Sequence, residues 1–278
     1  YLEGPTARIV SGCTNPNTKL VSWIHIEQHT KELASKSFRS YKEALDCYSK
    51  FDRTVCVSDT VKDDFESIFD TKKPVEVLYN TNESEKIKKL SDEKVNDVDF
   101  SKDIINIISV AKIVPSKGYD RLMKIHKKLI EKNIKNHIYI LGIGEEKEKY
   151  EKYLTENNLT DTFTFLGYRD NPYKYVKKAD LYVCSSRREG FSTAVTEALI
   201  VGTPVVSTNC SGAYELLGEN NEYGIVTENN EDALYEGIKK MLTTPDLLDA
   251  YAAKAKERGK AFSTEKTVKA VEEMLSAL

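Results

Sequence analysis

The feature that most constrains the fold is a regular alternation of short apolar runs and amphipathic segments from residue 104 onward. The first run, Ile104–Val110, is rich in β-branched residues, which is typical of a buried strand. Strands that alternate with helices build a parallel, doubly wound sheet, so we expect an α/β domain. The predicted strands are Ile104–Val110, His137–Leu141, Phe163–Leu166, Leu181–Ser185, Val205–Ser207 and Tyr223–Val226, and the predicted helices are Gly118–Lys132, Glu145–Asn157, Tyr173–Lys178, Thr193–Val201, Ala213–Leu217, one capped by Asn230, Pro245–Gly259 and Thr264–Leu278.

The first 98 residues have a sparser α/β pattern, with too few strands for a free-standing doubly wound domain. The polar stretch Lys86–Lys102 has little apolar face and is predicted to connect two domains. We therefore expect a partial domain with its linker over residues 1–98, a complete domain over 99–262 and a terminal helix over 263–278. The strands predicted in the first part are Leu20–Ile26, Thr54–Ser58 and Val75–Tyr79, and the helices are Lys36–Lys50 and Thr60–Phe69.

Composition excludes several classes of protein. With 41 basic and 44 acidic residues the net charge is −3, whereas a nucleic-acid-binding domain is expected to be basic. No apolar run approaches the ~18 residues of a membrane-spanning helix. The five cysteines are scattered without a C-x-x-C pair, which disfavours the common zinc and redox motifs. A protein of the reducing cytosol is the simplest expectation.

The densest group of reactive residues lies between the predicted strand Leu181–Ser185 and the predicted helix Thr193–Val201. In open α/β sheets, ligands bind at such junctions, outside the carboxyl ends of the strands. The backbone N–H groups of Ser192, Thr193 and Ala194 would face an anion such as a diphosphate.

Two carboxylates belong to this group. Glu189 lies in the loop, and Glu197 lies about one turn into the helix. An ionised carboxylate can only accept hydrogen bonds, so both suit the hydroxyl groups of a sugar or a ribose. The alternative is that both glutamates are solvated surface charges and that Gly190 is an ordinary loop glycine.

A second candidate loop follows the first predicted strand and precedes a helix. Lys112 and Lys117 could neutralise phosphates there, and Gly118 would let the backbone approach a ligand closely. Because lysine is common throughout the chain, solvated lysines are the alternative. The position after a strand, more than the residue type, favours a binding loop.

His25 ends the predicted strand Leu20–Ile26 and could act as an acid, a base or a positioning group, or simply be a structural histidine. With Glu27 and His29 it does not form H-E-x-x-H, and no helix aligns the two histidines, so a metal site is disfavoured. The triplet Asp97-Val98-Asp99 lies in the polar connector, and we interpret it as solvated.

Several nucleotide and hydrolase motifs are missing. Gly142-Ile143-Gly144 follows a predicted strand, but Lys147 stands where the dinucleotide fingerprint has its third glycine. Neither a P-loop nor a G-x-S-x-G elbow occurs. A nicotinamide-dependent oxidoreductase is therefore disfavoured.

Taken in order, VAKIVPSKGYDRLM, LGIGEE, FLGYRDNPYKYVKKADLYVCSS and REGFSTAVTEALIVGTPVVSTNCSGAYELL resemble the C-terminal half of the retaining glycosyltransferases of family four, which have the GT-B fold. Glu189 and Glu197 match the paired glutamates of that family. CVSDTVKDDF, VEVLYNTNE and LVSWIHIEQ resemble the end of its N-terminal domain and the strand with its active-site histidine. The resemblance implies two Rossmann-like domains with parallel sheets and a nucleotide-sugar donor bound mainly by the second.

The resemblance also implies roles for individual residues. Glu197 would hold the ribose hydroxyls, Glu189 would contact the donor sugar near the reacting carbon, and His25 would line the reaction centre. Lys117 matches the donor-phosphate lysine, whereas Lys112 stands where the family usually has arginine and lacks its planar fork. The residues implied to offer backbone to the sugar or diphosphate are Gly190, Phe191, Ser192 and Thr193, with Gly118 beside Lys117.

This sequence departs from the family pattern at two places. Ser211-Gly212-Ala213 replaces the usual paired glycines after a strand of the second domain. Nothing before Leu20 resembles the first strand and glycine-rich loop of the family, so we expect the chain to begin partway through the first domain, with Tyr1 an interior residue of a longer enzyme. The final helix matches the return of the family to its N-terminal domain.

The expected function is retaining transfer of a sugar from a nucleotide-diphosphate sugar to a glycan or lipid-linked acceptor in bacterial surface polysaccharide synthesis. The lysines and a helix N-terminus would neutralise the leaving diphosphate, so no metal and no cofactor are expected. We expect a cytoplasmic enzyme with a peripheral contact to the inner membrane surface and no nucleic-acid partner. The alternatives are a nucleotide-sugar epimerase of the same fold and a fragment that binds the donor without turnover.

Overall fold

The computed structural model describes residues 4–278, and the first three residues, Tyr1 among them, lie outside the described residues. Contacts within the chain divide it into two compact units. The first contains the chain as far as Thr81, together with Glu189–Phe191 and Glu265–Leu278. The second contains Asn82–Arg188 and Ser192–Thr264. The domain limits expected at residues 98 and 262 stay predictions.

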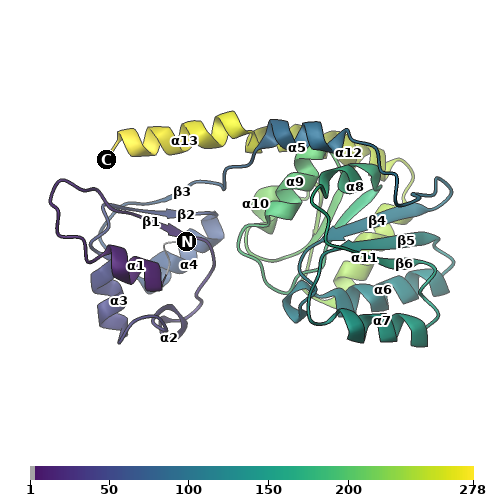
Figure 1. Ribbon diagram of the computed structural model, residues 1–278, viewed down its shortest axis with the longest axis horizontal. Coiled ribbons are helices and arrows are strands. Elements are labelled where there is room, and N and C mark those ends of the chain that lie inside the picture. Colours follow the sequence, from purple (N-terminus) through teal and green to yellow (C-terminus); the bar gives the residue numbers. More distant parts are fainter. Residues whose placement is uncertain (1–3) are drawn as a thin grey trace. The chain divides into compact units, whose positions relative to one another are not determined.

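The second unit is built on a parallel sheet with the strand order β6-β5-β4-β7-β8-β9 (Figure 1). Each predicted strand is present within two residues of its expected limits, so the doubly wound sheet inferred from the alternation is confirmed. The strands are β4 (Ile105–Val110), β5 (Asn136–Leu141), β6 (Phe163–Gly167), β7 (Leu181–Cys184), β8 (Val205–Thr208) and β9 (Ile225–Thr227).

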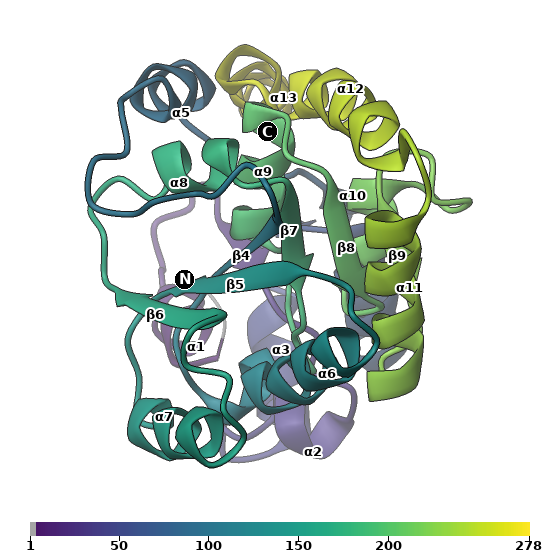
Figure 2. The same cartoon turned by 90° about the vertical axis from the view of Figure 1, so that its right-hand side faces the viewer.

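Helices cover both faces of this sheet, which explains why its strands are continuous apolar runs. Figure 2 shows α6, α7 and α11 on one face and α8, α9 and α12 on the other. The first face is stabilised by the apolar side of α6, where Leu122, Ile125 and Leu129 are fully buried. The helices of this unit are α5 (Ser84–Ser91), α6 (Tyr119–Glu131), α7 (Lys147–Glu156), α8 (Tyr173–Lys178), α9 (Thr193–Val201), α10 (Ala213–Leu217), α11 (Glu231–Thr243) and α12 (Leu247–Gly259).

The strand order reverses at one place in the sheet. From β4 the chain adds β5 and β6 on one side, and it then returns to place β7 on the other side of β4. In open α/β sheets the connections at such a switch point diverge and leave a crevice at the carboxyl ends of the strands. Loops after β4 and β7 therefore occupy the place where a ligand is most expected.

Helix α5 lies where the sequence suggests a connector. Its apolar face is small, but Ile87 is 3% exposed, and the helix packs against α8 and α9 within the second unit. The backbone N–H of Ser84 also donates to the Thr264 hydroxyl at 2.9 Å. Burial of one well-placed isoleucine and this hydrogen bond hold a segment that is polar by composition.

The first unit has a parallel sheet in the order β1-β2-β3, formed by Val21–Ile24, Arg53–Cys56 and Val75–Val77. An aromatic cluster fills its core, with the ring of Tyr48 5.3 Å from that of Phe65 and 4.8 Å from that of Phe69. The short helices α1 and α2 have too few apolar positions to be predicted. The helices are α1 (Pro5–Val10), α2 (Lys31–Ala34), α3 (Tyr41–Tyr48), α4 (Asp59–Ile68) and most of α13 (Thr264–Ser276).

The longest helices in the described part of the chain, α6, α11, α12 and α13, have 13 residues each. Each carries charged residues on its outer side, such as Lys124 on α6. Over residues 4–278, no helix combines the length and the apolar character needed to cross a membrane.

Candidate functional site

The loops after β4 and β7 touch each other at the switch point. Gly118, which precedes α6, has φ +68°, and a Cβ placed there would lie 2.1 Å from the backbone oxygen of Ser185. Only glycine fits both the left-handed backbone and this close approach. The Ser185 hydroxyl donates to the carbonyl of Lys117 at 2.8 Å, which fixes the predicted lysine loop against the loop after β7.

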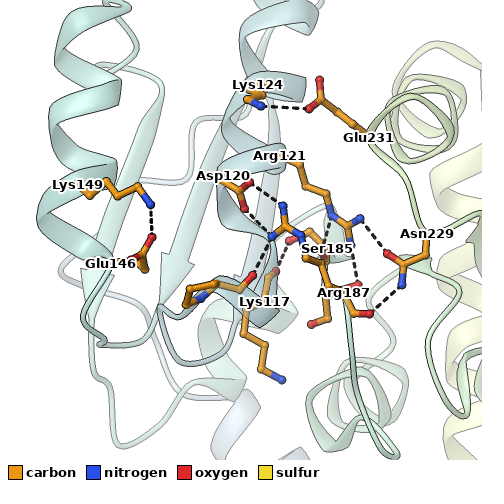
Figure 3. Close-up of polar contacts among 12 residues, drawn as sticks. Lys117, Asp120, Arg121, Lys124, Glu146, Lys149, Ser185, Arg187, Asn229 and Glu231 are labelled. Atoms are coloured by element: carbon orange, nitrogen blue, oxygen red, sulfur yellow. Dashed lines mark hydrogen bonds and ion pairs between the residues drawn. The ribbon is translucent and has the colours of Figure 1, made fainter. Parts of the chain in front are cut away.

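The guanidinium of Arg121, at the start of α6, holds the backbone of the loop after β7 (Figure 3). Arg121 is 5% exposed; its Nε donates to the carbonyl of Ser185 at 2.8 Å and its Nη2 to that of Ser186 at 2.6 Å. Its Nη1 donates to the side chain of Asn229 at 2.9 Å, which brings in the loop after β9. Burial lowers the pKa of Arg121, but a guanidinium stays charged at any physiological pH.

A second arginine joins the same two loops from the outside. Both Arg187 Nη atoms lie 2.7 Å from the Asp120 carboxylate in a bidentate pair, and Nη1 also donates to the carbonyl of Pro115 at 2.8 Å. Although burial raises it, the net pKa of Asp120 is lowered by its bonds to Arg187. The sequence prediction missed both arginines. A usable signal existed, because the chain has only eight arginines and three of them, including Arg188, lie in or beside these loops.

Helix α9 follows the loop after β7, so its N-terminus lies beside these loops. Ser192 caps it, with the hydroxyl oxygen accepting from the backbone N–H of Val195 at 3.4 Å. The amides of Thr193 and Ala194 stand in the first turn, where the helix itself supplies no acceptor. With the helix dipole, this turn suits an anion, as the sequence predicts.

Glu197 lies one turn into α9 and is half-buried. Burial raises the pKa of its carboxyl group to about 7, and a hydrogen bond from Tyr173 partly opposes that shift. The Tyr173 hydroxyl lies 3.4 Å from Oε1 of Glu197. Burial deprives this carboxyl group of hydrogen bonds from water. The hydroxyl groups of a ligand can supply hydrogen bonds in their place.

The remaining predicted residues group with the first unit. Glu189–Phe191 belong to it together with His25, and a Cβ on Gly190 would lie 2.0 Å from the backbone oxygen of His25. The ring of Phe191 stacks on that of Tyr79 with centroids 5.0 Å apart. His25 is half-buried, and this burial lowers its pKa, which favours a neutral imidazole at pH 7.

The two predicted lysines lie in the loop after β4 and differ in exposure. Lys117 is half-buried, and Lys112 is exposed. His29 faces Asp64, with Nδ1 and Oδ1 3.7 Å apart. Across residues 4–278, no three His, Cys, Asp or Glu side chains gather as a possible metal cluster, and metal independence stays a prediction.

The structure gives partners to Asp97 and places Ser211 and Gly212. Asp97, which we interpret from sequence as solvated, accepts hydrogen bonds from the Tyr175 hydroxyl at 2.8 and 2.9 Å and from Arg169. The connector aspartate therefore anchors α8. Ser211, in the loop that departs from the paired glycines, is 8% exposed, and Gly212 has φ +74°.

Comparisons with known proteins agree with this geometry. A family model described as "Glycosyl transferases group 1" matches residues 91–258. Over 262 residues the chain is 31% identical to a Campylobacter jejuni protein named N-acetylgalactosamine-N,N'-diacetylbacillosaminyl-diphospho-undecaprenol 4-alpha-N-acetylgalactosaminyltransferase, covering 92% of this chain and 66% of that protein. An uncharacterized glycosyltransferase of Methanocaldococcus jannaschii is 30% identical, with 91% of this chain and 70% of the relative covered. The chain thus spans about two thirds of the length of these relatives.

A solved structure shows the same architecture. HepE of Anabaena, in complex with UDP, superposes with a TM-score of 0.78 at 18% identity, covering 94% of this chain and 72% of that one. At this identity the likeness concerns the fold alone. It confirms the expected α/β fold of GT-B type with parallel sheets.

Proposed function

Because the chain belongs to the group 1 glycosyl transferases, we propose that it moves a sugar from a nucleotide-diphosphate sugar to a glycan or lipid-linked acceptor. One observation carries the proposal. The N-terminus of α9, with Glu197 one turn inside it, lies at the switch point of the second sheet beside the Lys117 loop. Such a place combines positive electrostatics for a diphosphate with a carboxylate for hydroxyl groups.

In the proposed complex, the diphosphate lies at the first turn of α9, and Lys112 and Lys117 neutralise its charge. Glu197 accepts hydrogen bonds from the ribose hydroxyls, and the backbone of Gly190 to Thr193 follows the sugar and the diphosphate. The clamps of Arg121 and Arg187 keep these loops in place before the donor arrives, which reduces the entropy lost on binding.

We propose that the reaction retains the configuration of the transferred sugar. The bond between the anomeric carbon and the diphosphate breaks while the acceptor oxygen bonds to that carbon from the same face. The products are the glycosylated acceptor, the nucleoside diphosphate and one proton, which the acceptor hydroxyl releases. The lysines and the helix dipole stabilise the charge that develops on the leaving diphosphate, so no metal is required by this scheme. Glu189 contacts the donor sugar near the reacting carbon. His25 is neutral at pH 7 and can accept a hydrogen bond from the same sugar.

The relatives guide the choice of substrates. The name of the Campylobacter relative specifies an acceptor linked to diphospho-undecaprenol, which favours a lipid-linked acceptor and a role in bacterial surface glycans for this chain too. HepE is in complex with UDP, so uridine nucleotides are the first donors to test. A lipid-linked acceptor would bring the enzyme to the cytoplasmic face of the inner membrane.

The first experiment is a thermal-shift screen of UDP-, GDP-, ADP- and dTDP-glucose, because a ligand that binds the folded state raises its melting temperature. We expect the sugar nucleotide of one base to raise the melting temperature. The Glu197→Ala variant should weaken binding of the selected sugar nucleotide about tenfold or more in calorimetry, as loss of a charge-assisted hydrogen bond predicts. Glu148→Ala, which removes an exposed carboxylate from α7, is the matched control and should bind like the wild type.

Unchanged affinity in Glu197→Ala would contradict the role given to that carboxylate. Analysis of the reaction products then distinguishes the possible activities. Incubation with donor alone distinguishes an epimerase, which needs no acceptor, from a transferase. Binding without any turnover, set beside a longer chain of the same protein, would identify a donor-binding fragment.

A further inference from the structure

Tyr173 stands at the start of α8, where two contacts fix the helix. The side-chain amide of the preceding Asn171 donates to the backbone oxygen of Leu90 at 2.9 Å and to the carboxylate of Glu93 at 3.0 Å. Helix α8 packs on α9 within the second unit. The position of the Tyr173 ring is therefore determined by the fold rather than by a mobile loop.

This placement directs the Tyr173 hydroxyl to one oxygen of a carboxylate in the candidate site. Its Oη lies 3.4 Å from Oε1 of Glu197, and both side chains are half-buried. A carboxylate has two oxygens, and the hydrogen bond to Oε1 limits rotation of the group. Oε2 then keeps its acceptor capacity for a ligand.

We propose that Tyr173 is a positioning residue that holds Oε1 of Glu197, orients Oε2 toward the ribose hydroxyls of the donor, and thereby sets the pH range over which the donor binds. The proposal rests on the proposed function, since it requires that Glu197 binds the donor. It concerns a residue that lies 24 positions before Glu197 and that neither motif nor spacing indicates.

The surroundings of the pair determine the direction of the pH effect. Burial raises the pKa of Glu197 to about 7, and the Tyr173 hydrogen bond opposes this because it stabilises the ionised form. Burial, then Glu197, and more weakly Glu83 ahead of α5, raise the pKa of Tyr173 to about 12, so the hydroxyl stays a donor. Lys256 of α12 lies against Gly202, at the opposite end of α9 from the binding turn.

The ionised carboxylate accepts hydrogen bonds on both oxygens and more strongly than the protonated acid, so affinity should follow the ionised fraction of Glu197. With a pKa of about 7, the wild type should bind about tenfold more tightly at pH 8 than at pH 6. Tyr173→Phe removes the stabilising hydrogen bond and keeps the ring. This variant should bind about threefold or more weakly at pH 6.5, because the midpoint moves upward, and by a smaller factor at pH 9, where only the lost orientation of Glu197 acts.

The binding experiment uses UDP-glucose, or the glucose nucleotide of whichever base the thermal-shift screen selects. A sugar nucleotide is preferable to UDP, whose terminal phosphate titrates near pH 6 and would add its own pH dependence. Affinities are measured from pH 5.5 to 9 for the wild type, Tyr173→Phe, Glu197→Gln and Tyr168→Phe. Glu197→Gln should show a flat profile, and Tyr168→Phe, which removes the hydroxyl of an exposed tyrosine, should keep the wild-type profile.

A second measurement needs no ligand. In protein labelled with ¹³C-glutamate, the carboxyl carbon that disappears in Glu197→Gln is that of Glu197, and its titration midpoint should be higher in Tyr173→Phe. In protein labelled with ¹³C-tyrosine, the ζ-carbon of Tyr173 should shift with that same midpoint in the wild type and not in Glu197→Gln. This last comparison holds even if Tyr173→Phe folds poorly.

The outcomes separate the two proposals. If the carboxyl midpoint and the binding profile are both unchanged in Tyr173→Phe while UDP-glucose still binds, the positioning role is wrong and the proposed function stands. If no sugar nucleotide binds at any pH although the two resonances titrate together, the proposed function is wrong and the donor role of Tyr173 is wrong with it. An upward shift in both readouts supports both.

Discussion

At the scale of single residues, hydrogen bonds from two arginines, one buried and one exposed, organise the candidate site. Arg121 satisfies the carbonyl groups of Ser185 and Ser186, and Arg187 forms a bidentate pair with Asp120. A buried carbonyl without a partner costs about 1–3 kcal/mol, so these contacts matter most when they are removed. The arginines hold the loops, and contact of the lysines with a ligand stays a prediction.

The Arg121→Met variant tests this view. Methionine fills much of the same space but removes the arginine donors of Ser185, while the Ser186 carbonyl keeps the Thr208 hydroxyl at 2.6 Å, so we expect the free energy of unfolding to fall by about 2 kcal/mol or more. Urea denaturation followed by circular dichroism measures it. Arg169→Met is the control, because its partner Asp97 is largely exposed and such pairs contribute at most about 1 kcal/mol. Equal losses in the two variants would contradict the role given to Arg121.

At the scale of elements, the site depends on how closely one loop approaches another. Gly118 and Gly167 both have left-handed backbones, with φ +68° and +72°. They differ in their surroundings, since a Cβ on Gly118 would meet Ser185 O at 2.1 Å, whereas one on Gly167 would meet nothing closer than 3.9 Å. The loop after β4 therefore needs glycine for two reasons, and the last position of β6 needs it for one.

This difference gives a matched pair of variants. Gly167→Ala should cost about 1 kcal/mol, which is the strain of a left-handed alanine. Gly118→Ala adds the clash with Ser185, so its cost should be larger by about 2 kcal/mol, and affinity for the selected sugar nucleotide should fall as the two loops separate. Chemical denaturation and calorimetry give the two quantities. Similar stability losses in both variants would show that the loops are free to move apart.

At the scale of the whole molecule, one buried and one half-buried histidine make stability depend on pH. His126 is fully buried between Asn136 and Thr162, with contacts of 2.8 Å to each, and burial lowers its pKa to about 4. Burial also lowers the pKa of His137 to about 4. Both histidines lie in the second unit, so their titration concerns the unit that carries the α9 site.

For a histidine whose pKa is lowered in the folded state, the unfolded chain binds more protons between pH 6.5 and 4. The stability contributed by His126 is therefore complete above pH 6.5 and is lost as pH falls toward 4, by up to about 3 kcal/mol. Glu197 acts in the opposite direction, since its raised pKa reduces stability as pH rises from 4.5 to about 7. Comparing a His126 variant with the wild type isolates the contribution of that histidine to the pH dependence of stability.

Urea denaturation at pH 7.5 and 5.0 measures this dependence. His126→Gln should show a smaller loss of stability on acidification than the wild type, and His29→Gln, which changes an exposed histidine, should show the wild-type loss. The single tryptophan, Trp23, lies in the first unit, so its fluorescence follows that unit while circular dichroism follows the chain as a whole. An equal acid loss in His126→Gln and the wild type would contradict the assignment.

Much of the fold follows from the sequence because its signals are local. Strand β4 and helix α9 are read from runs of neighbouring residues, and the limits of α8, α9 and α10 agree with the prediction. Helix α5 escapes prediction because only Ile87 and Leu90 mark its apolar face, and its stability comes from packing against α8 and α9. Local patterns cannot report an element whose burial is provided by distant partners.

The sequence alone determined the order of strands and helices, the family resemblance and the candidate residues from Lys112 to Glu197. All of these depend on residue type and on spacing along the chain. The tertiary structure alone decided that Arg121 holds Ser185, 64 positions away, and that Tyr173 meets Glu197. Hydrogen bonds and burial act through space, so the partner of a charged group and its pKa become known only when the chain has folded around it.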